Sequence, residues 1–190
     1  MRRLIFATNN KHKVEEVRAA GAIEIVTLAE AGLSGEIPET SDTLQGNALQ
    51  KAQWVWDRTH ADCFADDTGL EVEALGGAPG VYSARYAGEH CSFDDNIDKL
   101  LQALEGQTNR RACFRTVICL IEHGEPKYFE GRVDGQILTE RHSNGEGFGY
   151  DPVFMPERFA VSFAEMPLEV KNTISHRGLA VKRLIEYLKQ

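Results

Sequence analysis

The sequence predicts an α/β fold with a mixed central sheet flanked by helices, arranged in two lobes. One observation is the alternation of short apolar runs, typical of buried strands, with segments whose apolar residues recur at helical spacing. Another is a pair of long strand-like runs, Arg111–Glu122 and Lys127–Leu138, separated by His123-Gly124-Glu125-Pro126. Together the alternation and the antiparallel hairpin formed by the two long runs favour a mixed sheet, with the hairpin region forming one lobe.

The N-terminal part of the chain predicts two strands and two helices. The elements are a strand over Arg3–Ala7, a helix over Lys11–Ala20 closed by Gly21, a strand over Ile23–Val26, a loop over Gly32–Thr43 and a helix over Asn47–Thr59. In the second helix, Ala48, Ala52 and Val55 share one apolar stripe, and Lys51 lies beside it. A strand, a polar turn and a helix in this order are typical of a site at a strand end.

The rest of the chain predicts shorter elements around the hairpin. They are a short strand over Cys63–Ala65, a polar turn over Asp66–Gly69, an extended piece over Leu70–Val72, a shaped loop over Gly76–Gly88, a helix with the apolar stripe Phe93, Ile97, Leu100, Leu101 and Leu104, and a final helix over Ser175–Lys189. Ser175 is expected to precede the first turn of that last helix, which would carry His176 and Arg177.

Composition limits the class of protein. The chain has 190 residues, 42% hydrophobic and 26% charged, which is ordinary for a folded protein and predicts one domain over residues 1–190. Its net charge of −8 argues against nucleic acid and anionic membranes as partners, so an anionic ligand would need a local cationic pocket. The longest apolar run, Val117–Ile121, is far shorter than the roughly 20 residues of a membrane span.

Two further features bear on the compartment. The first residues, Met1–Thr8, contain too short an apolar stretch for a signal peptide, so we expect a cytoplasmic protein. The cysteines lack the C-x-x-C spacing of metal and redox motifs, and we expect them to be reduced packing residues. Zinc ligand spacing, a G-x-S-x-G elbow, a Walker A loop and a G-x-G-x-x-G motif after a strand are absent from the sequence.

Four polar clusters mark candidate sites. The first is Thr8-Asn9-Asn10-Lys11-His12-Lys13, where a turn enters a helix whose free N–H groups, together with Lys13, suit a phosphate. The alternative interpretation of this segment is a capped surface helix with solvated lysines.

The second cluster is acidic. It combines three acids of one loop with the adjacent aspartates that follow later in the chain, namely Glu36, Glu39, Asp42, Asp66 and Asp67. Carboxylates of this kind hold magnesium, although adjacent aspartates also occur simply as turn caps.

The third cluster, Gly147-Phe148-Gly149-Tyr150-Asp151-Pro152, interleaves aromatic rings with glycines and suits a stacked base, or else covers a hinge of the core. The fourth is Lys171 with Ser175-His176-Arg177-Gly178. An arginine in a first helical turn opposes the helix dipole unless an acceptor faces it, which favours a functional role.

Taken in order, these segments resemble the inosine triphosphate pyrophosphatase family over almost the whole chain. The resemblance rests on Thr8-x-Asn10-x-x-Lys13-x-x-Glu16, Glu39 with Asn47-Ala48-x-x-Lys51-Ala52, Ala65-Asp66-Asp67-Thr68-Gly69-Leu70, Gly76-Gly77-x-Pro79-Gly80-Val81-Tyr82-Ser83-Ala84-Arg85-Tyr86, Gly147-Phe148-Gly149-Tyr150-Asp151-Pro152 and Ser175-His176-Arg177-Gly178. It implies a nucleotide cleft between two lobes, a cytosolic homodimer, Mg²⁺ as cofactor, and hydrolysis of ITP, dITP or XTP, purine nucleoside triphosphates, to the monophosphate and pyrophosphate.

The resemblance also implies residue roles. Glu39 and Asp67 would bind the metal and Asp67 would act as general base. Substrate contacts would come from Thr8, Asn9, Asn10, Lys11, His12, Lys13, Lys51, Thr68, Arg85, Phe148, Gly149, Tyr150, Asp151, Lys171, His176 and Arg177. Two positions depart from the family pattern: Gly46 stands where many members carry an acid, and Thr68 stands where many carry a serine.

Base choice has a separate chemical argument. Hypoxanthine and xanthine carry an acceptor oxygen at C6, adenine carries an amino group there, and an arginine can only donate. A buried Arg177 or a backbone N–H facing C6 would therefore reject adenine. The alternatives are a pyrophosphatase of a related fold acting on other modified nucleotides, a non-catalytic nucleotide-binding module, and a structural or interaction module.

Overall fold

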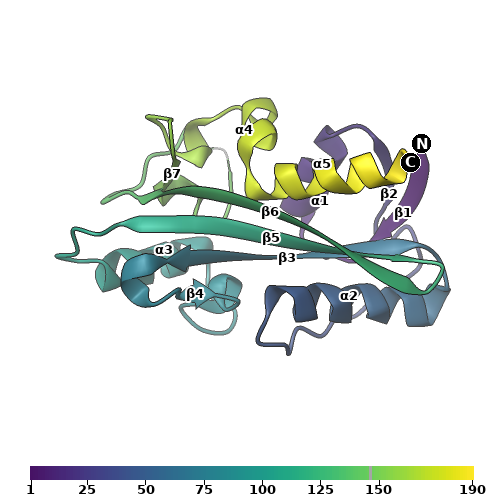
Figure 1. Ribbon diagram of the computed structural model, residues 1–190. Coiled ribbons are helices and arrows are strands. Elements are labelled where there is room, and N and C mark those ends of the chain that lie inside the picture. Colours follow the sequence, from purple (N-terminus) through teal and green to yellow (C-terminus); the bar gives the residue numbers. More distant parts are fainter. Residues whose placement is uncertain (146) are drawn as a thin grey trace. The chain divides into compact units, whose positions relative to one another are not determined.

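The protein, described here from a computed structural model, contains a mixed seven-stranded sheet within residues 1–145 and 147–190, the part of the chain that the structure describes (Figure 1). The strands of the main path lie in the order β2 (Ile23–Val26), β1 (Arg2–Phe6), β3 (Cys63–Val72), β5 (Arg111–Glu122), β6 (Glu125–Ile137) and β7 (Phe154–Pro156), and β4 (Pro79–Gly80) pairs with β3. β1 is parallel to β2 and β3, whereas β7 is antiparallel to β6. The predicted fold class is confirmed.

The residues group into two compact units. Unit 1 comprises residues 1–67, 116–131 and 176–190, and unit 2 comprises residues 68–115 and 132–175. β5 and β6 each contribute to both units, so the hairpin is not a lobe of its own. Its turn is His123-Gly124, whose φ angles of 53° and 87° fit the two-residue turn that matches the twist of paired strands.

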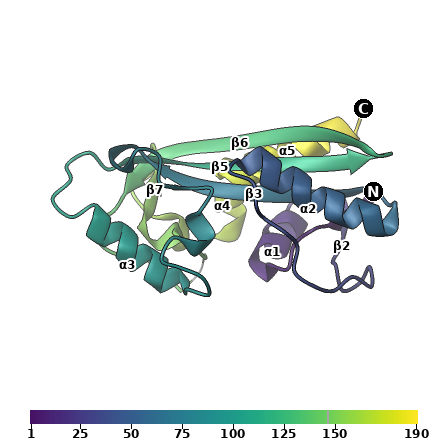
Figure 2. The same ribbon diagram turned by 90° about the horizontal axis from the view of Figure 1, so that it is seen from below.

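Unit 1 has helices on both faces of its part of the sheet. α1 (Lys11–Ala19) and α5 (His176–Leu188) lie on one face, and α2 (Leu44–Thr59) lies on the other (Figures 1 and 2). The apolar core between α1, α5 and the sheet contains a stacked pair, Phe6 and Phe64, whose ring centroids are 4.4 Å apart. This core fixes the helices whose first turns carry Lys13 and Arg177.

The first turn of α5 packs directly against the backbone of β6. A Cβ atom at Gly131 would overlap the carbonyl oxygen of His176 and crowd the amide of Ala180. A glycine is therefore required at this position for the helix to approach the strand so closely.

Unit 2 is built around a second apolar core. α3 (Phe93–Ala103) and α4 (Leu168–Ile174) belong to this unit, and aromatic rings of Phe114, Phe154 and Phe163 contact one another within its core. Ile97, Leu100 and Leu104 are buried as the helical stripe predicts. Phe93, the first residue of α3, is 47% exposed. Its assignment to the buried apolar stripe is therefore wrong.

The structure corrects two sequence predictions and adds one helix. Residues 66–69 form no turn but continue β3, because β5 pairs alongside and the sheet overrides the local turn preference of Asp and Gly. α2 begins at Leu44, since Thr43 accepts a hydrogen bond from the Gly46 N–H at its N-terminus. The chain before the final helix forms the short helix α4, which the sequence analysis does not include. The final helix, α5, begins at His176 as expected, because Ser175 is extended with a ψ of 156°.

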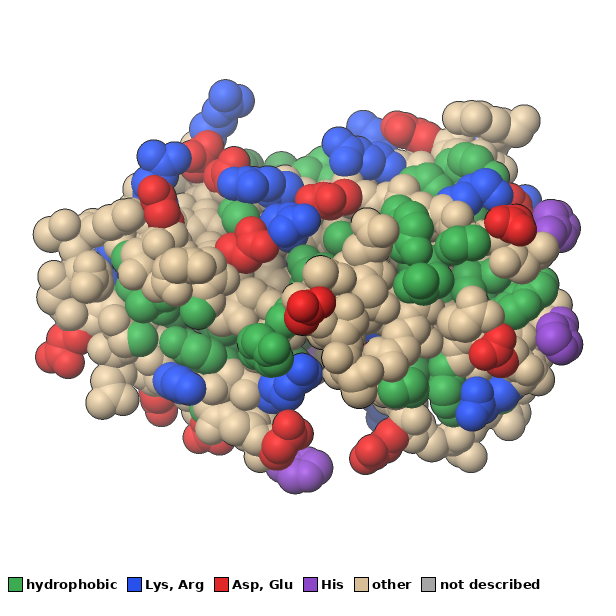
Figure 3. Space-filling view, turned by 60° about the horizontal axis from the view of Figure 1, so that its bottom comes forward, with side chains coloured by type: hydrophobic (Ala, Val, Ile, Leu, Met, Phe, Trp, Pro, Cys, Tyr) green, Lys and Arg blue, Asp and Glu red, His purple; other side chains and the backbone are tan. Residues whose placement is uncertain are grey.

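The cysteines agree with their expected role as reduced packing residues in three of four positions. Every cysteine of the chain is free, and Cys63, Cys113 and Cys119 are buried. In residues 1–145 and 147–190, none of the helices combines the length and apolar character of a membrane span. On the face seen in Figure 3, acidic and basic side chains are interspersed, so cationic groups there are local rather than part of one broad basic surface.

Candidate active site

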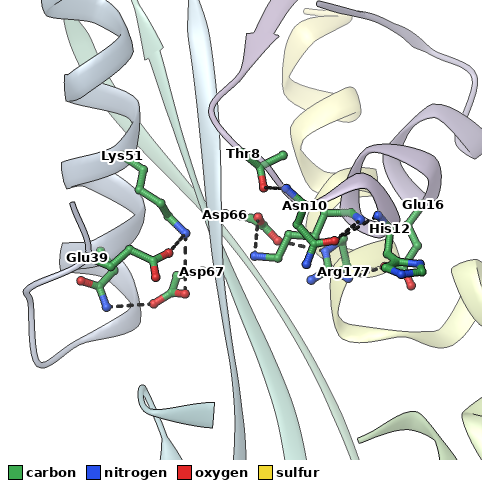
Figure 4. Close-up of polar contacts among 11 residues, drawn as sticks. Thr8, Asn10, His12, Glu16, Glu39, Lys51, Asp66, Asp67 and Arg177 are labelled. Atoms are coloured by element: carbon green, nitrogen blue, oxygen red, sulfur yellow. Dashed lines mark hydrogen bonds and ion pairs between the residues drawn. The ribbon is translucent and has the colours of Figure 1, made fainter. Parts of the chain in front are cut away.

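Two polar clusters of unit 1 meet at the adjacent residues Asp66 and Asp67 of β3. The parallel register of β1 with β3 ends at Phe6 and Phe64, and the Thr8–Lys13 segment follows β1 at this point. Successive residues of a strand point to opposite faces. Figure 4 shows Asp66 directed toward the side of Asn10, Glu16 and Arg177, whereas Asp67 is directed toward Glu39 and Lys51.

The Asp66 cluster balances two cations against two carboxylates. Lys13 Nζ lies 3.0 Å from Asp66 Oδ1, and Arg177 Nε donates to Asp66 Oδ2 at 2.9 Å. The guanidinium of Arg177 also donates to Glu16. Glu16, Asp66 and Arg177 are buried, with Asp66 only 1% exposed. Because removing a charge from water is costly, this burial requires that each charge be paired.

The protonation states in this cluster follow from the pairing. Burial alone would raise the pKa of Asp66, but Lys13 and Arg177 hold that pKa well below its ordinary value. Burial opposes the charge of Arg177, yet Glu16 and Asp66 raise its pKa. Burial lowers the pKa of Lys13, and Asp66 offsets only part of that effect.

The Asp67 cluster places two carboxylates around one ammonium. Lys51 Nζ donates to Glu39 Oε1 at 2.5 Å and lies 3.8 Å from Asp67 Oδ1. Asn47 Nδ2 donates to Asp67 Oδ2 at 3.1 Å. Asn47, Lys51 and Asp67 are buried, and Glu39 is half-buried. Within these contacts, negative charge exceeds positive charge by one.

In the Asp67 cluster, burial and this charge imbalance shift the pKa values differently from those of the Asp66 cluster. Burial raises the pKa of Asp67, and the charges of Lys51 and Lys13 offset only part of the increase. Although burial favours neutral lysine, Asp67 and Glu39 raise the pKa of Lys51. Burial also opposes ionisation of Glu39, but Lys51 lowers its pKa. Asp67 is thus a more basic carboxylate than Asp66.

The Thr8–Lys13 segment forms a capped helix start, as one interpretation of the sequence predicts, but Lys13 is paired with a carboxylate and is not solvated. Asn10 caps α1 by accepting hydrogen bonds from the N–H groups of His12 and Lys13, and Thr8 Oγ1 accepts from the Asn10 N–H. Lys11 and His12 are exposed, as on a surface helix, whereas Lys13 turns inward to Asp66. Asn9 Nδ2 contacts the carbonyl oxygen of Gly35 at 3.4 Å. Glu36 and Asp42 are exposed, in contrast to Glu39.

The structure explains why Gly46 departs from the family pattern. A Cβ atom there would overlap the Ser41 hydroxyl and approach Thr43 Oγ1. An acidic side chain at this position would require Ser41 and Thr43 to shift. Glu39 and Asp67 are the carboxylates that converge on Lys51.

In unit 2, Lys171 and Asp151 form a buried ion pair with an oxygen-to-nitrogen distance of 2.7 Å. Asp151 also accepts from the Phe148 N–H at 3.0 Å, and Lys171 Nζ lies 5.1 Å from the Phe148 ring centroid. These three predicted substrate contacts are therefore brought together. The Tyr150 hydroxyl instead donates to the Ser83 carbonyl oxygen, so this ring serves the core of unit 2.

The other predicted positions are more dispersed. Arg85 lies over the ring of Tyr82 at 5.1 Å, and Gly149 and Thr68 are half-buried. His176 is buried in the first turn of α5 beside Arg177.

Sequence reasoning gives no role to Glu16 or Asn47. Both lie at helical spacing from a predicted lysine, Glu16 three residues after Lys13 and Asn47 four before Lys51, which is the available signal.

Comparison with known proteins identifies the family. The model of the Ham1 family matches residues 4–187. The chain belongs to the Ham1 family. Its curated Ham1-like relatives include a dITP/XTP pyrophosphatase of Porphyromonas gingivalis, 58% identical over 99% of this chain and 98% of the relative. Another of the same name, from Flavobacterium johnsoniae, is 53% identical over 98% and 97%.

Solved Ham1 structures agree with this fold. A HAM1 protein from Coxiella burnetii superimposes with a TM-score of 0.90 and 35% identity, covering 100% of this chain and 99% of that one. The Staphylococcus aureus Ham1 protein gives a TM-score of 0.88 and 36% identity, covering 99% and 98%. The family assignment made from the ordered motifs is confirmed.

Proposed function

We propose that this chain hydrolyses the non-canonical purine nucleoside triphosphates dITP, XTP and ITP to the monophosphate and pyrophosphate, and so cleans the nucleotide pool. Its curated relatives named dITP/XTP pyrophosphatase support the substrate class. The observation that carries the chemistry is the buried cluster in which Glu39 and Asp67 converge on Lys51. Two carboxylates and a cation at one place suit a metal-bound triphosphate.

The donor set of this cluster fits a divalent cation. Glu39 and Asp67 offer hard oxygen ligands, and their combined charge exceeds that of Lys51. Magnesium is commonly held by one or two carboxylates together with substrate phosphates and water. When bound, Mg²⁺ would neutralise phosphate charge and make a bound water more acidic. Glu39 and Asp67 would hold it.

The basic groups of unit 1 would orient the triphosphate. Lys13 and Lys51 would contact phosphate oxygens, and the Thr8–Asn10 turn would supply further donors. Asp67 would accept a proton from the water that attacks the α-phosphorus. The bond between the α-phosphorus and the oxygen that bridges to the β-phosphorus would break, and pyrophosphate would leave with that oxygen.

Unit 2 would contribute to recognition of the nucleoside. Phe148 would stack on the base, and Asp151 and Lys171 would place their polar groups beside it. In unit 1, Arg177 and His176 would face base acceptors such as the C6 oxygen, with Glu16 and Asp66 fixing the guanidinium. We further propose that the protein acts as a cytoplasmic homodimer.

Pyrophosphate release from a panel of nucleotides tests this function. With Mg²⁺, we expect kcat/KM for dITP, XTP and ITP to exceed that for dATP and dUTP by at least about 100-fold, as for a site that discriminates by hydrogen bonding. Glu39→Gln should weaken the metal dependence, whereas Glu36→Gln, an exposed acid of the same loop, should not. Preference for pyrimidine or methylated nucleotides would favour the related pyrophosphatases, and binding without pyrophosphate release would favour a sensor.

A further inference from the structure

Three consecutive residues of the loop before α2 are fastened to one face of that helix. Glu39 accepts from Lys51, and Ser41 donates its backbone N–H to Asn47 Oδ1 at 2.9 Å. Between them, the Thr40 N–H donates to Gln50 Oε1 at 2.8 Å and Gln50 Nε2 donates to the Thr40 hydroxyl at 2.9 Å. Positions 47, 50 and 51 share a helical face because they are three and four residues apart. The loop carrying Glu39 therefore runs antiparallel to α2 in a fixed register.

Asn47 differs from the other two helix residues because it also reaches β3. Its Oδ1 accepts from Ser41 in the loop, while its Nδ2 donates to Asp67 Oδ2 at 3.1 Å in the strand. The side chain is only 1% exposed, and the two partners dictate its orientation, since a flipped amide would face a donor with a donor and a carboxylate with an oxygen. One buried amide thus connects the Glu39 loop to the Asp67 strand.

We propose that Asn47 is a positioning residue that holds Glu39 and Asp67 at the mutual placement a divalent cation requires. The proposal rests on the metal site of the proposed function. Glu39 and Asp67 carry like charges and repel each other, while Lys51, and more weakly Lys13, attract both. Lys51 and Gln50 also hold the loop to α2, but Asn47 is the one of these three that hydrogen-bonds Asp67. Metal sites depend on ligands held within about 0.5 Å of the productive geometry.

Gln50 provides a matched control. It lies on the same helical face and holds the same loop by two hydrogen bonds to Thr40, but its contacts are to the loop rather than to Asp67. Replacing either Asn47 or Gln50 by alanine removes hydrogen bonds that hold the loop to α2. Replacing Asn47 additionally releases Asp67 from its donor.

The test measures Mn²⁺ binding without nucleotide, by the loss of the free-ion paramagnetic resonance signal, in wild type, Asn47→Ala, Gln50→Ala and Glu39→Gln. We expect Asn47→Ala to weaken Mn²⁺ binding by about 10-fold or more, as for loss of a partner that orients a metal ligand, and Gln50→Ala to weaken it by less than about threefold. Amide hydrogen exchange should show loss of protection at Ser41 in Asn47→Ala. Melting temperatures identify variants that fold, and Asn47→Leu, which keeps the side-chain volume, replaces the alanine variant if that fails to fold.

Two results separate the possible failures. Equal Mn²⁺ affinity in the folded Asn47 variant and Gln50→Ala, with tighter binding in wild type than in Glu39→Gln, overturns the role of Asn47 and leaves the metal site intact. Absence of saturable binding in wild type, or equal binding in wild type and Glu39→Gln, overturns the metal site itself and with it this inference.

Discussion

Asp66 and Asp67 are neighbours in sequence, yet their surroundings differ in charge balance. Asp66 is contacted by Lys13 and Arg177, and the whole cluster contains as many cations as carboxylates. Asp67 shares one lysine with Glu39. The pKa values move in opposite directions, lowered for Asp66 and raised for Asp67. The alternation of a single strand thus separates a carboxylate that stabilises the fold from one available for chemistry.

The largest expected effect concerns the side of Asp67. We expect Asp67→Asn to abolish turnover, by at least about 10³-fold, because the amide cannot accept a proton from water, while nucleotide still binds. Pyrophosphate release and equilibrium binding of dITP measure the two properties. Asp42→Asn, at an exposed acid, is the control and should remain active. Near-normal turnover in Asp67→Asn would remove this residue from the mechanism.

The next largest effect is a loss in the free energy of unfolding when the Asp66 cluster loses a cation. Arg177→Leu leaves Asp66 and Glu16 buried with Lys13 as the remaining cation, so we expect a loss of about 3–5 kcal/mol in the free energy of unfolding. Urea unfolding measures it. Arg18→Leu, at an exposed pair with Glu30, should cost less than about 1 kcal/mol. Equal losses in the two variants would contradict the distinction between the clusters.

A smaller effect is the dependence of stability on pH, which should have opposite signs at the two aspartates. The lowered pKa of Asp66 contributes stability above its unfolded pKa of about 4, and this contribution is lost as pH falls through the folded value. Because the pKa of Asp67 is raised in the folded state, its ionised form lowers the free energy of unfolding. This destabilisation decreases as pH falls through the folded pKa.

Urea unfolding from neutral to acid pH tests these signs. At neutral pH, Asp66→Asn should be less stable than wild type and Asp67→Asn more stable. Both differences should shrink as the medium becomes acid. A difference of the same sign for the two variants would show that their environments are not opposed.

The smallest effects concern the N-terminal caps of α1 and α2, the helices that carry Lys13 and Lys51. Asn10→Ala and Thr43→Ala should each cost about 1 kcal/mol in the free energy of unfolding, because each removes an acceptor for N–H groups in a first helical turn. Asn10→Ala should also raise KM, since Lys13 is in the turn that Asn10 caps. Thermal unfolding and steady-state rates measure these changes. A stability loss without a change in KM would limit Asn10 to a structural role.

The sequence predicts much of the fold because its periodic patterns are local. The strands over Ile23–Val26 and Arg111–Glu122 lie where apolar patterning places them. The error at Asp66–Gly69 arose because local turn preference competes with pairing to a distant strand, which one sequence does not reveal.

The residue types of the candidate site could be proposed from the sequence, but the pairing of their side chains could not. Glu39, Lys51 and Asp67 were identified by type and by motif order. The partnership of Arg177 with Asp66 joins residues 111 positions apart, and no local pattern encodes it. The same holds for the amide of Asn47, whose two partners lie in a loop and a strand.

The close contact at Gly131 gives β6 an influence over a site whose polar groups it does not supply. Because the α5 backbone rests on that glycine, any larger residue would push the start of the helix outward and carry the Arg177 guanidinium with it. Adding even one methyl group at Gly131 would therefore disturb the ion pairs of Arg177 with Asp66 and Glu16, although the substituted residue lies on a strand that contributes no side chain to them.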